Sequence, residues 1–264
     1  MKNILEEIIE YKKIEVAERK NLLSEEVLLK KLDNSYKAIS LVSALKSKNN
    51  FPNIIAEHKL ASPSKGRIYN GDLLPEEIAT GYQQAGATAI SVLTDKKWFQ
   101  GDLSHLEQIR KNVSLPILRK EFIVDPYQIL EAKIYNADAI LLIAAALPKE
   151  KLTRLGTYAK ELGLEVLYEV HDASELELTA EPWVSVVGVN NRSLKTMEVD
   201  WKNSVEIFER LPDDKVKISE SGIDSIETIK ELQDIGYNGF LMGEVFMKEA
   251  DPGGKLAEFL LCAE

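Results

Sequence analysis

Eight short apolar runs recur along the chain, and amphipathic segments of helix length separate each run from the next. The runs are Asn53–Glu57, Ala89–Leu93, Leu115–Lys120, Ala139–Ile143, Glu165–Glu169, Val184–Asn190, Val216–Ser219 and Gly239–Met242. Their ends lie 21 to 36 residues apart, which matches one strand, one helix and two loops. The spacing predicts eight successive strand–helix units.

Eight such units favour a closed (β/α)8 TIM barrel over an open, doubly wound sheet. A dinucleotide-binding sheet of the second kind needs a Gly-x-Gly-x-x-Gly turn after its first strand, and no such turn follows the first run. Pro75 and Pro126 fit first-turn positions of helices, and Asp172 and Asp224, each with Glu three residues later, are expected to cap helices. The predicted fold class is therefore α/β.

The first fifty residues carry no strand pattern. Apolar residues at near-helical spacing predict an amphipathic helix there: Leu5, Ile8, Ile9 and Val16. A second short helix is expected at about Ile39–Leu45. We expect one domain, residues 1–264, in which an N-terminal helical extension (1–50) packs on the barrel (51–264).

The charge balance and the cysteine count exclude several classes of protein. Lys and Arg number 33 against 43 Asp and Glu, a net charge of −10 with no basic block, which argues against nucleic acid or anionic membrane as a partner. One cysteine, Cys262, excludes an internal disulfide, and three histidines offer no zinc spacing. The longest apolar run, Ala139–Leu147, is too short to span a membrane, and the charged N-terminus lacks a signal-peptide core. We expect a cytoplasmic protein.

Polar residues end most of the apolar runs, where a barrel places its catalytic groups. If Ile55 points into the barrel, side-chain alternation sends Glu57 and Lys59 inward as well and turns His58 toward the helices. The same alternation predicts that these residues share the barrel mouth: Lys120, Phe122, Glu169, Asn190, Arg192 and Glu220. Rim salt bridges are the alternative for any one pair, but agreement on five strands favours an acid–base site.

Three loops predict a phosphate site. Ser62-Pro63-Ser64-Lys65-Gly66 follows the first run, Ser221-Gly222 the seventh and Gly243-Glu244 the eighth. Barrels commonly bind phosphate with the loops after strands seven and eight, and glycine lets the backbone approach the oxygens. One Gly turn is a weak signal, because turns use glycine for their own geometry.

Other candidates stay open or are set aside. Asp95 and Asp125 do not make a metal site without further carboxylates, and Asp125 before Pro126 reads better as a helix cap. Trp98 and Phe99 stack on an aromatic substrate or pack a rim loop. Arg192 pairs with Glu220 or with a substrate carboxylate.

Several stretches resemble the indole-3-glycerol-phosphate synthase family: IIAEHKLASPSKG, SVLTDKKWFQG, PILRKEFIVDPYQI, GVNNRSL and SESGI. The resemblance runs from about Phe51 to the C-terminus, and the helical extension fits it. It implies a carbon–carbon lyase of tryptophan biosynthesis that closes the indole ring of 1-(2-carboxyphenylamino)-1-deoxyribulose 5-phosphate. The reaction releases CO2 and water and uses no metal or organic cofactor.

The resemblance also implies residue roles. Lys120 is expected to be the general acid and Glu169 the general base, with Glu57 and Asn190 in support. Lys59 is expected to contact the substrate carboxylate, and which lysine acts as the acid in dehydration stays open. The phosphate would be held by Ser62, Ser221, Gly222, Gly243 and the backbone of Glu244, and the pocket lined by Phe99, Phe122, Arg192 and Glu220.

The sequence departs from the family pattern at His58 and Leu60 beside Lys59, and in the last loop, GEVFM. Phosphoribosylanthranilate isomerase is the runner-up enzyme, but its Cys–Asp pair is missing because the one Cys lies in the tail. A non-catalytic phosphate-ligand binder is the second alternative. We expect a monomer, with weak association with neighbouring pathway enzymes left open.

Overall fold

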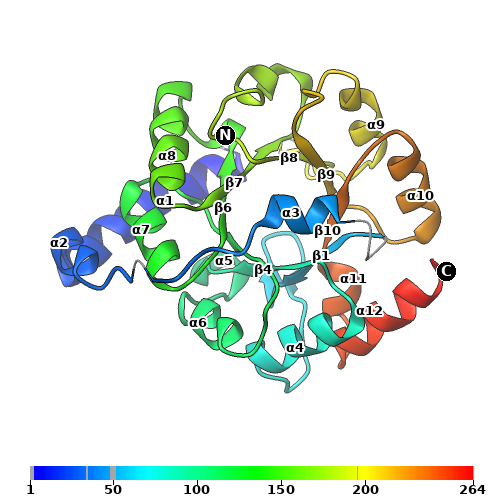
Figure 1. Ribbon diagram of the computed structural model, residues 1–264, viewed down its shortest axis with the longest axis horizontal. Helices are drawn as coiled ribbons and strands as arrows, with labels where there is room; N and C mark the ends of the chain where they lie inside the picture. The colour runs from blue at the N-terminus through cyan, green and yellow to red at the C-terminus, as the bar shows by residue number, and fades with distance from the viewer. Residues whose placement is uncertain (1–2, 34, 48–51, 195, 264) are drawn as a thin grey trace.

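The computed structural model describes residues 3–33, 35–47, 52–194 and 196–263. Eight parallel strands close into a barrel in the order β1-β10-β9-β8-β7-β6-β5-β4, with β4 paired to β1 (Figure 1). The strands are β1 (Ile54–His58), β4 (Ala89–Leu93), β5 (Ile117–Lys120), β6 (Ala139–Ile143), β7 (Glu165–Val170), β8 (Val186–Asn190), β9 (Val216–Glu220) and β10 (Gly239–Met242). The predicted barrel is confirmed, and each strand lies within two residues of its run.

Helices surround the barrel between successive strands. They are α4 (Pro75–Ala85), α5 (Lys96–Phe99), α6 (Ser104–Arg110), α7 (Pro126–Ile134), α8 (Lys149–Glu161), α9 (Lys202–Phe208), α10 (Ile226–Asp234), α11 (Glu244–Met247) and α12 (Pro252–Leu261), with 3-10 turns η1 (Ala144–Ala146) and η2 (Ala173–Leu178). A small hairpin, β2 (Ala61–Ser62) with β3 (Gly66–Arg67), follows β1. In the described part of the chain, no helix is both long and apolar enough to cross a membrane.

The helix starts follow local capping chemistry. Pro75 and Pro126 occupy the first turns of α4 and α7, and Asp125 caps α7 by accepting the backbone N–H of Tyr127 at 2.9 Å. Asp172 caps η2 as predicted. The prediction for Asp224 was wrong, because Ser225 is the last extended residue before α10 and its hydroxyl caps that helix.

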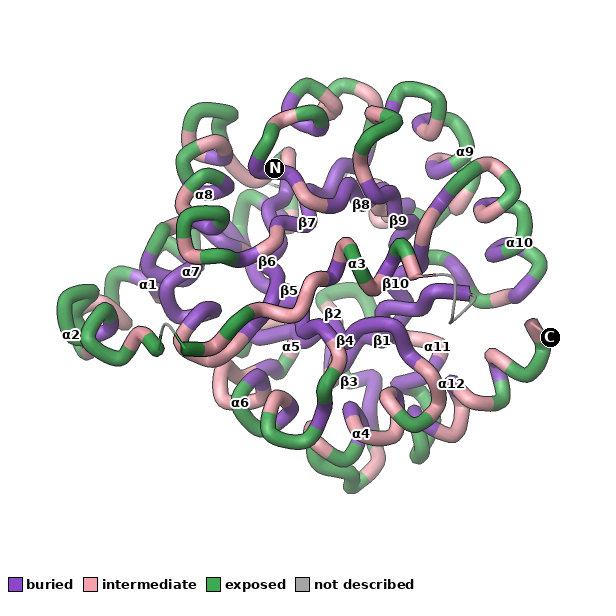
Figure 2. The backbone as a smooth tube through the Cα atoms, viewed as in Figure 1, coloured by how far each residue is buried: buried purple, intermediate pink, exposed green. Residues whose placement is uncertain are grey.

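Side chains alternate between two cores along each strand. Ile55, Leu118 and Leu167 pack together inside the barrel, whereas Ile54 and Ala56 pack against the surrounding helices. Figure 2 shows the eight barrel strands almost entirely buried, inside the exposed outer faces of the helices. Both layers are therefore filled, and charged side chains such as Glu57 and Lys120 reach the interior near the strand ends.

His58 faces the helices, as the alternation predicted. Its ring is buried and packs edge-on against His105 of α6, with 5.3 Å between the ring centroids. Neither ring nitrogen of His58 has a hydrogen-bond partner among the described residues. Burial lowers the pKa of His58 to about 3, so the ring is neutral and serves packing.

The N-terminal segment forms α1 (Ile4–Leu22), α2 (Glu25–Leu29) and α3 (Leu41–Lys46), and reaches both ends of the barrel. At the end where the strands finish, Lys12 of α1 forms ion pairs with Asp95 at 2.8 Å and Glu121 at 3.1 Å. At the opposite end, Ser40 before α3 donates a hydrogen bond of 2.6 Å to Glu165, the first residue of β7. Figure 1 shows α3 lying across this end.

Candidate active site

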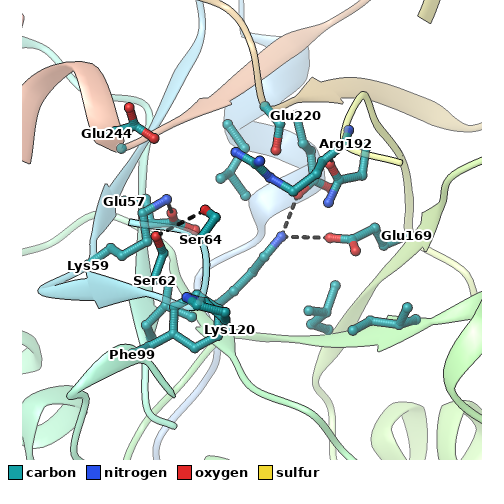
Figure 3. Close-up of a pocket in the computed structure, with 18 of the residues that line it drawn as sticks. Glu57, Lys59, Ser62, Ser64, Phe99, Lys120, Glu169, Arg192, Glu220 and Glu244 are labelled. Atoms are coloured by element: carbon teal, nitrogen blue, oxygen red, sulfur yellow. Dashed lines mark hydrogen bonds and ion pairs between the residues drawn. The ribbon is translucent and has the colours of Figure 1, made fainter. Parts of the chain in front are cut away.

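A cavity of about 210 Å³ opens at the carboxyl ends of the strands (Figure 3). All fourteen residues predicted for the site line it: Glu57, Lys59, Ser62, Phe99, Lys120, Phe122, Glu169, Asn190, Arg192, Glu220, Ser221, Gly222, Gly243 and Glu244. Strand alternation explains this gathering, because inward positions at the ends of neighbouring strands point to one centre. Their proximity is a structural fact, and their roles remain predictions.

Lys120 lies at the centre of the charged groups. Its ammonium is 2.8 Å from Glu169 Oε2 and also contacts Glu220 Oε2, so one cation from β5 joins carboxylates from β7 and β9 (Figure 3). The Lys120 side chain is 12% exposed and both carboxylates are nearly sealed. A buried ion pair of this kind costs desolvation and adds little net stability, and this one lies on the cavity, where it can meet a ligand.

Burial and nearby charges shift the pKa values of the two carboxyl groups around Lys120 in opposite directions. Burial alone would raise the pKa of Glu169, but the Lys120 cation outweighs it and holds that pKa well below its ordinary value. Burial raises the pKa of Glu220, and the charge of Glu169 adds to this effect against the pull of Lys120. Glu169 is therefore the ionised, base form at neutral pH, and Glu220 is the carboxyl that holds a proton more readily.

Lys120 itself stays protonated. Burial alone would lower the pKa of Lys120, but the charges of Glu169 and Glu220 raise it above its ordinary value. A second lysine, Lys59, pairs with Glu57 at 2.7 Å from the end of β1. The cavity thus offers two ammonium groups, one just after β1 and one at the end of β5, each held by carboxylates.

Asn190 and Arg192 form the β8 side of the cavity. Asn190 Oδ1 accepts the backbone N–H of Arg192 at 3.0 Å, and the Arg192 guanidinium donates to the carbonyl of Met197 at 3.1 Å. The open question about Arg192 is answered in part, because Glu220 takes Lys120 as its partner. The guanidinium lines the cavity, where it can meet an anionic group of a ligand.

The predicted phosphate loops meet on one side of the cavity. Ser221 and Gly222 both have left-handed backbones, with φ of 67° and 70°, which turn the chain sharply after β9. Gly243 follows β10, and a Cβ on it would lie 2.7 Å from the Cβ of Glu57, so only glycine fits there. Ser62 lies in the hairpin after β1, on the same cavity.

Two lysines pair with the Glu244 side chain, whose carboxylate would otherwise repel a bound phosphate. It contacts Lys65 of the first loop and lies 2.8 Å from Lys248. Burial alone would raise the pKa of Glu244, but hydrogen bonds from Lys248 and Lys65 lower it to about 2. The charge of the ionised carboxylate is balanced by the two lysines, so the backbone N–H groups of this loop can bind an anion.

Aromatic and apolar groups cover the remaining walls. Phe99 and Phe122 face each other with ring centroids 6.0 Å apart, whereas Trp98 packs edge-on against Tyr11 of α1 at 5.2 Å. The two adjacent residues therefore have different surroundings: Phe99 lines the cavity, whereas Trp98 packs at the rim. Apolar residues of α1 also reach the cavity: Ile4, Leu5 and Ile8.

His171 is the site residue that the sequence analysis missed. It follows β7, lines the cavity, and places Nε2 3.3 Å from Glu169 Oε1 and Nδ1 3.4 Å from Glu175 Oε2. The signal was present, because His171 is two residues after Glu169 and so continues the same inward face. In the sequence, His171 was considered only as one of three histidines without zinc spacing.

The two aspartates set aside as metal ligands have structural partners. Asp95 caps α5 and pairs with Lys12, and Asp125 pairs with Lys20 at 2.6 Å. Over the ranges that the structure describes, no three His, Cys, Asp or Glu side chains converge as a metal site would require.

Comparison with known proteins gives the family. The indole-3-glycerol phosphate synthase family model matches residues 5–259. The protein of that name from Bacteroides thetaiotaomicron is 46% identical over 98% of both chains, and that from Aliarcobacter butzleri is 45% identical over 97% of this chain and 98% of its own. A tryptophan synthase alpha-subunit mutant from Pyrococcus furiosus shares the barrel fold, with a TM-score of 0.58 and 17% identity over 80% of this chain and 98% of its own. The chain belongs to the indole-3-glycerol phosphate synthase family, enzymes of tryptophan biosynthesis.

Proposed function

We propose that Lys120 and Glu169 are the acid and the base with which this enzyme closes the indole ring. The substrate is 1-(2-carboxyphenylamino)-1-deoxyribulose 5-phosphate, and the products are indole-3-glycerol phosphate, CO2 and water. One observation carries the assignment: the Lys120 ammonium lies on the cavity 2.8 Å from an ionised Glu169. A cation for the carbonyl oxygen and a carboxylate for a carbon-bound proton are the two groups this chemistry needs.

Ring closure comes first. The aromatic carbon that bears the carboxylate attacks the ribulose carbonyl carbon, and Lys120 gives its proton to the carbonyl oxygen. The bond to the carboxylate then breaks, CO2 leaves, and its electron pair restores the aromatic ring. Proton transfer to the developing alkoxide lowers the barrier, because a free oxyanion in a buried site is costly.

Dehydration completes the pyrrole ring. The new hydroxyl leaves as water after taking a proton, and Glu169 accepts the proton released from the neighbouring carbon. Lys59, paired with Glu57, is positioned to contact the substrate carboxylate. It is also the alternative acid for this second step, and Asn190 supports the same side of the cavity.

The phosphate and the aromatic ring anchor the substrate away from the reacting bonds. We assign the phosphate to Ser62, Ser221, Gly222, Gly243 and the backbone of Glu244, and the aromatic ring to Phe99 and Phe122, with Arg192 and Glu220 completing the pocket. Binding energy from these remote groups orients the reacting atoms. Phe99 and Phe122 lie together on the cavity, with ring centroids 6.0 Å apart, which supports this division.

The chain's other properties are proposed on the same basis. A cavity of small-molecule size, a net charge of −10 and a family of biosynthetic enzymes support a monomeric, single-domain, cytoplasmic enzyme whose partner is its phosphosugar–anthranilate substrate. Weak association with neighbouring pathway enzymes is compatible with this proposal. Sedimentation of the purified protein measures the oligomeric state.

The assignment is tested by following indole fluorescence with the substrate, in EDTA and without added metal. Wild-type protein should give a rising signal, and Lys120→Ala should lower kcat by about 10³-fold while the circular dichroism spectrum stays unchanged. Retention of most activity in Lys120→Ala would remove this residue from the acid role. A flat wild-type signal in EDTA that added metal restores would contradict a metal-free reaction.

A further inference from the structure

His171 is a buried ionisable group on the cavity that the proposed acid–base steps do not use. Its side chain is 5% exposed, and each ring nitrogen faces a carboxylate: Nε2 lies 3.3 Å from Glu169 and Nδ1 lies 3.4 Å from Glu175. The imidazole thus bridges a cavity-lining carboxylate and a more peripheral one.

The backbone fixes this imidazole in place. The N–H of His171 donates to Glu175 Oε2 at 2.7 Å, and its carbonyl accepts from Asn203 Nδ2 at 2.9 Å. Asp172 accepts the N–H of Ser174 at 2.8 Å and so starts the 3-10 turn that carries Glu175. The backbone hydrogen bonds of His171, the 3-10 turn and the two carboxylates therefore hold the ring in one position.

We propose that His171 is the positioning residue of Glu169. Lys120 contacts Oε2 of the Glu169 carboxylate and His171 contacts Oε1, so two cationic donors from different positions fix the plane of the base. Glu175 holds the imidazole in turn, as a carboxylate commonly orients a histidine beside an active group. The proposal rests on the base role of Glu169 proposed above.

The charges around Glu169 give the proposal a direction. Glu169 faces Lys120 from β5, Glu220 from β9 and His171 from its own strand end. Glu57 of β1 and Arg192, which follows the neighbouring strand β8, line the same cavity. Burial alone would lower the pKa of His171, but hydrogen bonds with Glu169 and Glu175 raise it to about 9. His171 is therefore an imidazolium at neutral pH and favours the ionised form of Glu169.

Removal of this imidazolium should raise the pKa of Glu169. The acidic limb of the kcat/KM profile, where the base gains a proton, should then move to higher pH. His171→Leu is expected to move that limb up by about one pH unit and to lower kcat about 10- to 100-fold, with KM changed less than kcat. His171→Gln keeps a neutral donor near the Nε2 position, so it should recover part of kcat but little of the pH shift.

A second buried histidine supplies the matched control. His58 is 1% exposed on β1 but faces α6, so His58→Leu should leave the acidic limb where it is in wild-type protein. Glu175→Gln weakens the outer hold on the imidazole and should shift the limb in the same direction as His171→Leu, by a smaller amount.

The experiment measures kcat, KM and the pH profile of these variants alongside Glu169→Gln. If His171→Leu and His171→Gln both keep the wild-type limb and kcat while Glu169→Gln is inactive, the positioning role is wrong and the base assignment survives. If Glu169→Gln keeps its activity, the base assignment fails and this inference fails with it. Should His171→Leu not fold, the limb of His171→Gln and Glu175→Gln decides, and wild-type profiles for both overturn the proposal.

Discussion

Two buried lysines in this enzyme have carboxylate partners, yet only one of them lines the cavity. Lys12 of α1 is fully buried among Glu15, Asp95 and Glu121, at 2.8 to 3.1 Å. Lys120 of β5 lies between Glu169 and Glu220 and is 12% exposed to the cavity. Burial raises the cost of charge in both places, and carboxylates raise the pKa of both lysines against it.

The difference lies in what each ammonium faces. The protein closes all round Lys12, whose three carboxylates come from α1 itself and from the ends of β4 and β5. Around Lys120, the two carboxyl groups have pKa values shifted in opposite directions, and one side is open to a ligand. Pairing and burial therefore do not mark a catalytic lysine. A catalytic lysine is marked instead by access to a cavity and by carboxyl partners whose pKa values differ.

The largest effect should come from the partner of Lys120. Glu169→Gln removes the base but keeps the shape and a hydrogen-bond acceptor, so kcat should fall about 10²- to 10⁴-fold while the unfolding midpoint in urea changes little. The acidic limb of the kcat/KM profile should disappear at the same time. A profile identical to that of wild-type protein would show that Glu169 is not the base.

The sealed lysine should give the opposite pattern. Lys12→Met leaves Asp95 buried without its cation and removes one of the two cations beside Glu121, so the free energy of unfolding should fall by about 3–5 kcal/mol. The fraction that remains folded should keep kcat within about tenfold of wild type. Urea denaturation and single-turnover rates on the same sample separate the two quantities, and a large loss of kcat at unchanged stability would break the distinction between the two lysines.

The smallest effect concerns His58, which is sealed like Lys12 but uncharged. Its folded-state pKa of about 3 lies below the ordinary 6.5, so the unfolded chain binds one more proton between these values. The stability that the neutral ring allows is therefore present above pH 6.5 and is lost as the pH falls toward 3. His58→Phe should remove about 1.4 kcal/mol per pH unit of that slope between pH 6.5 and 5.

Urea unfolding at several pH values measures the slope, and kcat at neutral pH serves as the control. Parallel stability curves for His58→Phe and wild-type protein would show that this ring does not titrate on unfolding. A large loss of kcat in His58→Phe with an unchanged free energy of unfolding at neutral pH would place His58 in the site.

The sequence predicted the barrel and the inward residues because both depend on short-range regularities. Alternation along a strand has a period of two, so Ile55 inside requires Glu57 inside, and the run length decides where the strand ends. The same rule turned His58 outward. The roles of the fourteen site residues remain proposals, because proximity on one cavity does not show which group moves a proton.

What the sequence did not predict depends on partners far apart in the chain. Lys12 lies on the apolar face of α1, three residues after Ile9 and four before Val16. No local sequence pattern shows that Asp95 and Glu121 form its ion pairs. The contact of His171 with Glu169 was within reach of the alternation rule, but Glu175 enters through a 3-10 turn. The Asp224 error was a one-residue shift in a cap, which backbone geometry alone decides.

The N-terminal segment that touches both ends of the barrel has a consequence for the order of folding. Arg19 of α1 bonds to Glu131, 112 residues later, and Ser40 bonds to Glu165, 125 residues later. Contacts of such sequence separation form slowly, and during synthesis these helices precede every strand they meet. The wall of the cavity made by Ile4, Leu5 and Ile8 is therefore synthesised before the strands that it covers, and it can pack on them only after they form, so we expect the cavity to be completed late in folding.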